Sequence, residues 1–433
     1  MLFHRLCVFL IAVVLFCTIS GIVDASRNPP PEFETNYTLP PTKTPLPCVA
    51  TNTENVFAVG LYAVFLLFAG LAVHYWRSRK IIFGLAVCSV IVLGFLLQGC
   101  PCPVGMFQNL VQAFIEPSVT VAWSVIFLFA LPILAALFWG RIFCSAVCPL
   151  GAVQELTAII NLKIPEQYEQ FFGLIRYFIL GIGTFCVIVG LGYVVCQFDP
   201  FASIFWHSGL YYILIFSGIV LVTGFFLGRP FCRFLCPYGA LLGLCGSLTT
   251  RKVTVTPSKC DQCNLCKQVC PYNAILPPTA EPTPSEKRSD FMKLMITIGA
   301  LPIIIFVLAH IGSLTAPRLI MLNRDIIAAH LLRAEEEKSV ETPGTFPETR
   351  GLMQYGTPSE EVYERASQAK KRFDIAGVGL GAWIGLVIGL KWISLVLRRR
   401  RTEYEVDPAR CFSCGRCFWY CPNQKGQRLL LDE

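Results

Sequence analysis

Twelve of the 21 cysteines in this 433-residue chain fall into closely spaced groups. Residues 260–271 read Cys-Asp-Gln-Cys-Asn-Leu-Cys-Lys-Gln-Val-Cys-Pro, and residues 411–422 repeat the same spacing of cysteines and proline. Thiolates in a C-x2-C-x2-C-x3-C-P run are typical ligands of [4Fe–4S] clusters. A structural zinc site, the main alternative, favours two C-x2-C pairs and does not require the terminal proline. The two segments therefore predict iron–sulfur chemistry, which is the transfer of single electrons.

The fourth cysteine of each segment is offset from the other three, so it cannot close on the same cluster. In two-cluster ferredoxins this cysteine binds the other cluster, and the same exchange is expected here. One cluster is predicted at Cys260, Cys263, Cys266 and Cys421, and the other at Cys411, Cys414, Cys417 and Cys270. Short strands are expected before the two segments, at Val253–Pro257 and Tyr404–Pro408.

A second kind of cysteine group occurs twice. Residues 140–151 read Gly-Arg-Ile-Phe-Cys-Ser-Ala-Val-Cys-Pro-Leu-Gly, and residues 228–239 read Gly-Arg-Pro-Phe-Cys-Arg-Phe-Leu-Cys-Pro-Tyr-Gly. Each copy follows a long apolar stretch, which indicates an internal duplication of a membrane unit. One pair cannot complete a site, but the duplication predicts that Cys144 and Cys148 meet Cys232 and Cys236. Four thiolates suit a third [4Fe–4S] cluster, and the alternatives are copper(I), a dithiol redox pair or inert buried cysteines.

Membrane-spanning helices are the elements expected to position these groups. The chain is 54% hydrophobic and 15% charged, with a mean hydropathy of +0.58, whereas soluble domains are about 25% charged. Seven apolar segments approach the ~20 residues that cross a bilayer; they lie at 56–76, 81–98, 119–139, 172–194, 211–228, 292–310 and 375–397. The predicted fold is an α-helical polytopic membrane protein of six to eight spans, with a small α+β ferredoxin-like domain that holds two clusters.

Basic residues alternate between the loops in a way that orients the chain. The loops at 99–118 and 195–210 contain no Lys or Arg, whereas the loops at the other membrane face are rich in them. Loops rich in Lys and Arg face the cytoplasm. Both kinds of cysteine group are therefore expected on the cytoplasmic side. The basic residues behind the net charge of +8 gather at the ends of the apolar segments, as this orientation requires, so no nucleic-acid partner is expected.

Four other cysteines, Cys48, Cys100, Cys102 and Cys196, are then predicted outside the membrane. In an oxidising compartment they predict two disulfides, or one disulfide beside a metal-binding or redox-active Cys100/Cys102 pair; unpaired thiols are the third alternative. In the second repeat, Asp199-Pro200 occupies the place of Cys102-Pro103, so only the first repeat carries the thiols.

The domain organisation follows from these segments. It comprises a signal peptide or N-terminal anchor (1–25), a periplasmic linker (26–55), the duplicated membrane domain (56–250), the first ferredoxin half (251–290), a membrane hairpin (291–397) with a periplasmic loop (311–372), and the second ferredoxin half (398–433). The hairpin returns the chain to the side it left, so both ferredoxin halves can meet. Within the loop, Asn323–Lys338 and Ser359–Phe373 are predicted to be helical, either as an amphipathic cap or as part of a solvated linker.

The duplicated Gly-Arg-x-Phe-Cys-x3-Cys-Pro-x-Gly followed by C-x2-C-x2-C-x3-C-P resembles the membrane polyferredoxins of the NapH/NosR type, over residues 56–285 and the C-terminal motif. The resemblance implies a bacterial inner-membrane protein, part of a multi-subunit complex, that passes electrons between the quinol pool or cytoplasmic donors and a periplasmic redox partner. It also implies that the four cysteines of the duplicated motif are the family's membrane pairs and that the other eight are cluster ligands. Such a chain is an electron-transfer subunit rather than a stand-alone enzyme.

Two features depart from that family pattern. Residues 26–55 are too short for the flavin-binding domain of the NosR branch, and the long loop at 311–372 is not expected of a minimal NapH-type protein. A related group reduces copper through similar pairs during cytochrome oxidase assembly. A membrane copper reductase or assembly factor is therefore the alternative function.

Overall fold

The structure is a computed structural model of the 433-residue chain. It describes residues 52–97, 102–116, 119–160, 162–205, 211–255, 262–279, 284–337, 358–397, 401 and 403–422. The predicted N-terminal leader (1–25) and nearly all of the linker (26–55) lie outside these residues. Each of the seven predicted apolar segments coincides largely with a helix. Five of these helices are long and apolar enough to cross a membrane, and Trp123–Trp139 and Tyr211–Phe226 are shorter apolar helices.

The described elements in chain order are α2 (Asn52–His74), α3 (Arg79–Ser89), the π-helical η1 (Val90–Leu96), α4 (Pro103–Ile115), α5 (Trp123–Trp139), the π-helical η2 (Phe143–Val147), α6 (Pro149–Thr157), α7 (Glu166–Ile188), α8 (Val194–Gln197), α9 (Pro200–Phe205), α10 (Tyr211–Phe226), the π-helical η3 (Phe231–Leu235), α11 (Pro237–Ser247), α12 (Leu265–Val269), β1 (Ile275–Leu276), α13 (Pro284–Leu319), the 3-10 turn η4 (Ile320–Leu322), α14 (Arg324–Glu337), α16 (Ser359–Val396), β2 (Glu405–Val406) and α17 (Arg416–Tyr420).

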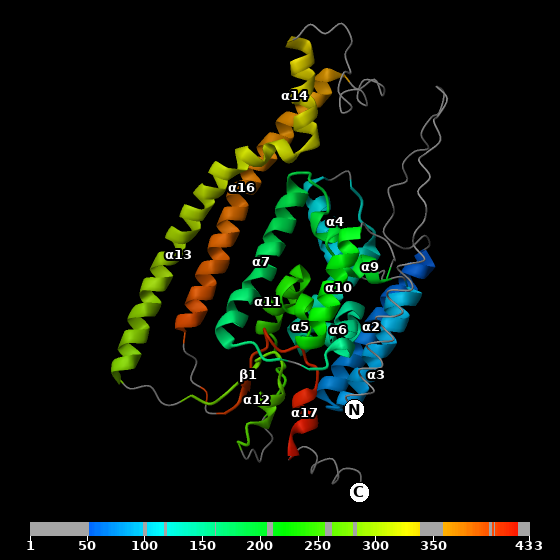
Figure 1. The fold of residues 1–433 in the computed structure, drawn as a ribbon, viewed down its shortest axis with the longest axis vertical. Coiled ribbons are helices and arrows are strands. Elements are labelled where there is room, and N and C mark those ends of the chain that lie inside the picture. Colours follow the sequence, from blue (N-terminus) through cyan, green and yellow to red (C-terminus); the bar gives the residue numbers. More distant parts are fainter. Residues whose placement is uncertain are drawn as a thin grey trace.

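The membrane domain contains the same succession of elements twice. A long helix is followed by a short helix that begins at a proline, then by an apolar helix, a π-helical turn and another helix that begins at a proline. The first series is α3/η1, α4, α5, η2 and α6. The second is α7, α9, α10, η3 and α11, with the one-turn helix α8 as an addition between α7 and α9. The short helices α4 and α9 lie toward the end of the molecule that is remote from β1 and α17 (Figure 1).

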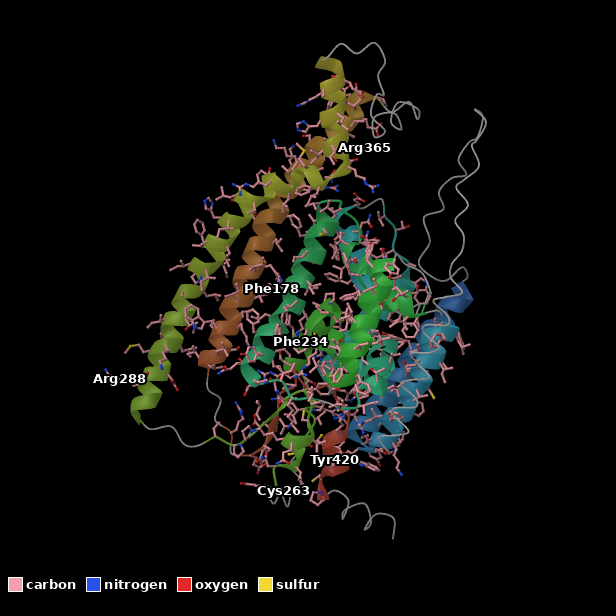
Figure 2. The ribbon with its side chains drawn as sticks, in the orientation of Figure 1. Phe178, Phe234, Cys263, Arg288, Arg365 and Tyr420 are labelled. Carbon is pink, nitrogen blue, oxygen red and sulfur yellow. The ribbon has the colours of Figure 1, made fainter. Side chains whose placement is uncertain are left out.

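The inserted hairpin forms a long two-helix arm beside this domain (Figure 1). Glycines allow α13 and α16 to touch along their backbones, since a Cβ on Gly381 would lie 2.1 Å from the Leu308 carbonyl oxygen. Trp383 of α16 ties the arm to α7 by donating to the Tyr177 carbonyl oxygen at 2.9 Å. The predicted loop helices correspond to α14 and the start of α16, so Arg365 lies at the opposite end of the molecule from Cys263 and Tyr420 (Figure 2).

The two ferredoxin halves come together despite the arm between them. Strand β1 of the first half pairs antiparallel with β2 of the second, with Ile275 opposite Val406. The expected strand at 404–408 therefore exists as β2. Of the expected strand at 253–257, the structure describes residues 253–255, which are irregular, and the first half pairs through β1, after its cysteines. Val253 and Val255 bury their side chains without joining the sheet, which accounts for their strand-like alternation.

Candidate iron–sulfur sites

The two CxxxCP motifs fold as π-helical turns rather than ordinary α-helical turns. In the first, the Cys148 backbone N–H donates to the Phe143 carbonyl oxygen at 2.9 Å. In the second, the Cys236 N–H donates to the Phe231 carbonyl oxygen at 2.8 Å. The proline after each second cysteine begins a new helix, α6 or α11, where its missing N–H costs nothing. Single π-helical turns are frequent at functional sites because they displace side chains from the regular helical register.

The final glycine of each motif is required by close packing. A Cβ on Gly151 would lie 2.7 Å from the Cys144 carbonyl oxygen, and one on Gly239 would lie 3.0 Å from that of Cys232. Any larger residue would push the proline-initiated helix away from the cysteine turn. The recurrence of this glycine in both copies therefore has a steric cause.

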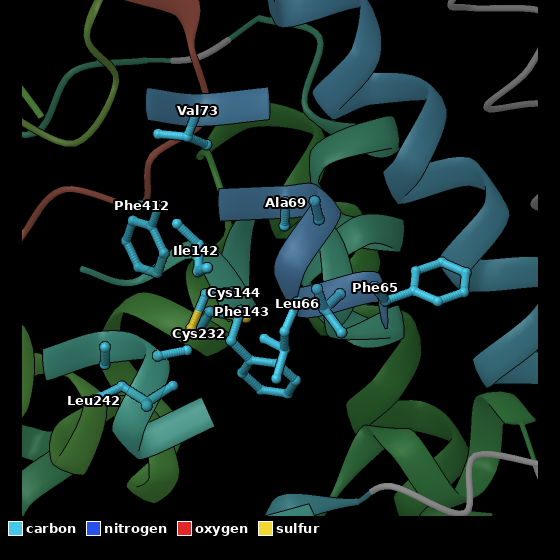
Figure 3. Close-up of a cluster of buried hydrophobic side chains, with 14 of the residues drawn as sticks. Phe65, Leu66, Ala69, Val73, Ile142, Phe143, Cys144, Cys232, Leu242 and Phe412 are labelled. Carbon is cyan, nitrogen blue, oxygen red and sulfur yellow. The ribbon is translucent and has the colours of Figure 1, made fainter. Parts of the chain in front are cut away.

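The four cysteines of the two motifs contribute to a single core cluster. Cys144 and Cys232 are buried in it side by side (Figure 3), and Cys148 and Cys236 pack against it. Two side chains reach these sulfurs. Gln154 Nε2 donates to Cys232 Sγ at 3.4 Å, and Arg141 Nη2 lies 3.9 Å from Cys144 Sγ.

The ferredoxin halves contribute jointly to a second group of cysteines. Cys270 from the first half and Cys411, Cys414 and Cys417 from the second line one pocket. Burial raises the pKa of the Cys411 thiol to about 12. This thiol therefore stays protonated until a bound metal displaces the proton, so metal binding would release protons.

The remaining predicted cluster ligands lie on neighbouring short elements. Cys263 precedes α12, Cys266 lies on it, and Cys421 follows α17; these two helices lie side by side. Cys260, the fourth member of the predicted set, lies outside the described residues.

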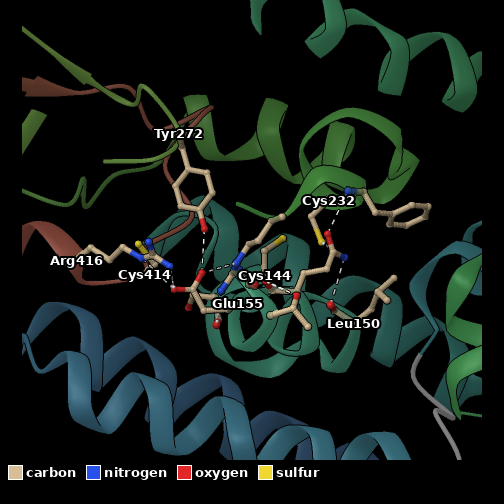
Figure 4. Close-up of polar contacts among 12 residues, drawn as sticks. Cys144, Leu150, Glu155, Cys232, Tyr272, Cys414 and Arg416 are labelled. Atoms are coloured by element: carbon tan, nitrogen blue, oxygen red, sulfur yellow. Dashed lines mark hydrogen bonds and ion pairs between the residues drawn. The ribbon is translucent and has the colours of Figure 1, made fainter. Parts of the chain in front are cut away.

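A buried carboxylate, Glu155 of α6, joins the membrane domain to both ferredoxin halves (Figure 4). Its oxygens accept from Arg416 Nη2 at 2.9 Å, from Arg229 Nε at 3.1 Å, from Arg79 Nη2 at 3.2 Å and from the Tyr272 hydroxyl at 3.0 Å. Burial alone would raise the pKa of this carboxyl, but the Arg416, Arg229 and Arg79 guanidiniums hold it well below its usual value. Glu155 is therefore an ionised hub between elements that are far apart in sequence.

Positive charge is in excess around the cysteine sites. The buried charged side chains in this region are five arginines and two glutamates: Arg141, Arg176, Arg229, Arg233, Arg416, Glu155 and Glu169. Glu155 and Glu169 pair with three of the arginines. Within the described part of the chain, Arg141 and Arg176 have no carboxylate partner, and the Nε atom of each lacks a hydrogen-bond acceptor. A buried unpaired guanidinium is costly, so the site is suited to an anionic group such as a thiolate-bound iron–sulfur cluster.

The spacing of the thiols bears on which metal group they suit. Across the residues that the structure describes, no three Cys, His, Asp or Glu side chains converge closely enough to hold one metal ion. A single ion binds all of its sulfur ligands at about 2.3 Å, whereas each thiolate of a [4Fe–4S] cluster binds a different iron. Among the described residues, the thiols thus do not form a site for one ion with three or more such ligands.

The predicted outer thiols are only partly described. Cys102 and Cys196 are free thiols, whereas Cys48 and Cys100 lie outside the described residues. Cys102 Sγ donates to Asp199 Oδ2 at 3.1 Å, and Cys196 Sγ donates to Gln108 Oε1 at 2.8 Å. The two equivalent pre-proline positions, Cys102 and Asp199, thus face each other. Cys102 and Cys196 do not form the expected disulfides.

Sequence reasoning missed Glu155 and Phe412. Phe412 is buried in the same core cluster as Cys144 and Cys232, lines the pocket of Cys270 and Cys411, and contacts the Tyr272 ring at a centroid distance of 4.8 Å. A signal for Glu155 was present, because an acid among apolar residues of a membrane protein usually has a buried partner. Phe412 had no comparable signal, since aromatic residues are ordinary members of cores.

Comparison with known proteins supports iron–sulfur chemistry at both kinds of site. A family described as "4Fe-4S binding domain" matches residues 121–165 and 209–256, which contain both CxxxCP motifs. A second family with the same description matches residues 253–276. No solved structure matches the chain.

Several characterised bacterial proteins are similar to the chain. Protein NirI of Paracoccus denitrificans is 29% identical over 47% of this chain and 32% of its own length. Regulatory protein NosR of Stutzerimonas stutzeri is 27% identical over 46% of this chain and 30% of its own. Ferredoxin-type protein NapH of Escherichia coli is 26% identical over 47% of this chain and 78% of its own. The chain thus spans about a third of NirI and NosR. It is a membrane protein with 4Fe–4S binding domains, similar to proteins that include the ferredoxin-type protein NapH and the regulatory protein NosR.

Proposed function

We propose that the chain is an electron conduit of a bacterial inner membrane. It would hold two [4Fe–4S] clusters in the cytoplasmic ferredoxin domain and a third between the CxxxCP motifs. Such clusters accept and release single electrons when bound. The conduit would link the quinol pool or cytoplasmic donors to a periplasmic redox protein, within a multi-subunit complex.

One observation carries the proposal for the third site. Four cysteines from two sequence-related motifs share one core cluster, beside two buried arginines, Arg141 and Arg176, that have no carboxylate partner among the described residues. Inert buried thiols are neutral and would leave both guanidiniums uncompensated. An anionic cluster bound by four thiolates would offset their charge, which supports the cluster interpretation over structural cysteines.

The proposed ligands follow the exchange between ferredoxin halves. Cys411, Cys414, Cys417 and Cys270 would hold one cluster and Cys260, Cys263, Cys266 and Cys421 the other, while Cys144, Cys148, Cys232 and Cys236 would hold the third. The shared pocket of Cys270 and the second-half cysteines supports the first of these sets. Phe412 and the Glu155 hub would fix the ferredoxin domain against the membrane motifs.

The test is the iron and acid-labile sulfide content of anaerobically purified protein. About twelve iron atoms per chain are expected, four for each cluster. The double variant Cys144→Ser/Cys232→Ser should fall to about eight, because only the ferredoxin domain would retain iron. Cys88→Ser, which removes an exposed cysteine of α3, is the matched control and should keep the wild-type content.

About eight iron atoms in the wild-type protein, unchanged in the double variant, would contradict the third cluster. Stoichiometric copper lost on the same double substitution would then support the copper-reductase alternative. Iron that falls equally in the Cys88→Ser control would show that the loss reflects damage to the fold rather than a missing ligand.

A further inference from the structure

The two arginines of the duplicated motif are equivalent in sequence but not in charge balance. Arg229 is buried and its Nε donates to Glu155 Oε2 at 3.1 Å, while its Nη2 donates to the Ser145 carbonyl oxygen at 3.0 Å. Arg141 is also buried, with 1% of its surface exposed. Arg141 lacks a carboxylate partner in the described part of the chain, so its positive charge is not offset by the protein.

Arg141 contacts both cysteine sites. Its Nη2 lies 3.9 Å from Cys144 Sγ, in the membrane motif. Its Nη1 donates to the Ala409 carbonyl oxygen at 3.1 Å, two residues before Cys411. Its guanidinium carbon lies 4.1 Å from the centroid of the Phe412 ring. The guanidinium thus approaches a sulfur of the membrane motif, whereas it meets the ferredoxin half at a carbonyl and a ring.

Two glycines of α11 hold the Arg141 side chain in this position. A Cβ on Gly246 would lie 3.3 Å from Arg141 Cγ, and one on Gly239 would lie 3.3 Å from Arg141 Nη2. The arginine stem therefore occupies space that a side chain on α11 would fill. A charge held this closely need not be reoriented when an electron arrives, which makes it an effective electrostatic group.

A fixed positive charge favours the more negative, reduced form of a nearby redox group, and the effect is strong in a buried site. We propose that Arg141 raises the reduction potential of the CxxxCP site above that of the Cys411 site, so that electrons move from the ferredoxin domain into the membrane. Arg229 does not have this effect, because Glu155 offsets its charge. The inference rests on the proposed function, since it requires a redox group between the CxxxCP motifs.

A redox titration followed by electron paramagnetic resonance on the full-length protein tests this. Arg141→Gln removes the charge but keeps a donor for Ala409, and it should lower the potential of the membrane site by at least about 59 mV, which is a tenfold change in a one-electron equilibrium. The signals of the ferredoxin sites should shift less. Arg141→Lys keeps the charge and should stay close to wild type. Arg410→Gln is the control, because Arg410 is near Cys411 but pairs with Asp407 at 3.2 Å.

The possible results separate the two proposals. If the wild-type protein gave no third paramagnetic resonance signal, the proposed third cluster and this inference would both be contradicted. A third signal whose potential is unchanged in Arg141→Gln would overturn the inference alone. If Arg141→Gln lost the third signal while Arg141→Lys kept it, the charge would be needed at the site, in support of the inference. Loss in both variants would overturn it in favour of a purely steric role for Arg141.

Discussion

Replacing Glu155 with glutamine should release the ferredoxin halves from the membrane domain. The substitution keeps the size of the side chain but removes the charge shared by three guanidiniums. Arg229 and Arg416, which pair with it at 3.1 and 2.9 Å, are both buried, so they would be left without a counter-ion. Breaking one buried pair costs about 3–5 kcal/mol. The partly exposed Arg79 should add less than about 1 kcal/mol.

This loss corresponds to a roughly 10²–10⁴-fold change in the docking equilibrium. Amide hydrogen exchange in detergent is a suitable assay, because protection of 270–276 and 405–417 should fall by that factor. Glu361→Gln is the matched control, since it breaks an exposed pair with Arg365 at 2.5 Å and should change protection less than about fivefold. A change of less than tenfold in Glu155→Gln would show that the buried hub does not hold the two halves in place.

Two further perturbations test other parts of the fold. Gly381→Val should separate α13 from α16 and destabilise the protein by about 1–3 kcal/mol, because a Cβ there would collide with the Leu308 carbonyl oxygen; Gly379→Val, with open space around it, should have little effect on the unfolding midpoint. Burial, with a smaller contribution from Asp199, raises the pKa of the Cys196 thiol to about 12 from an ordinary 9.0. A raised pKa favours the neutral thiol, so alkylation at pH 8 should be roughly a thousandfold slower than for an ordinary thiol and should rise with pH. Rapid labelling at pH 8 without denaturant would contradict this.

The helices and the cysteine groups could be predicted because their signals are local. Apolar segments of near-bilayer length form helices at the expected places. The repeated Cys-Pro spacing predicts that Cys144 and Cys232 meet, and both belong to one core cluster. The final glycine of the repeated motif also has a steric reason, because it packs on the carbonyl of the first cysteine in both copies. The glycine contact involves only neighbouring residues, whereas the meeting of Cys144 and Cys232 follows from the duplication of the motif.

The pairings between distant residues could not be predicted in the same way. Glu155 meets Arg416 across 261 positions, and neither residue reveals its partner by type or spacing. The alternation around Val253 predicts a first ferredoxin strand before the cysteines, but the strand that pairs with β2 is Ile275–Leu276. Alternation records which side chains are buried, and burial against a helix or loop gives the same pattern as burial in a sheet.

The long arm inside the ferredoxin domain affects how the protein is made. A ribosome completes the first cysteine segment well before the second, and α13 and α16 lie between them. The pocket lined by Cys270 and Cys411 and the pairing of β1 with β2 both need the two halves. Neither can form on a nascent chain that ends within the arm. Under the proposed function, metallation of that pocket would be a late step of biogenesis, because it could begin only after the whole arm has been synthesised.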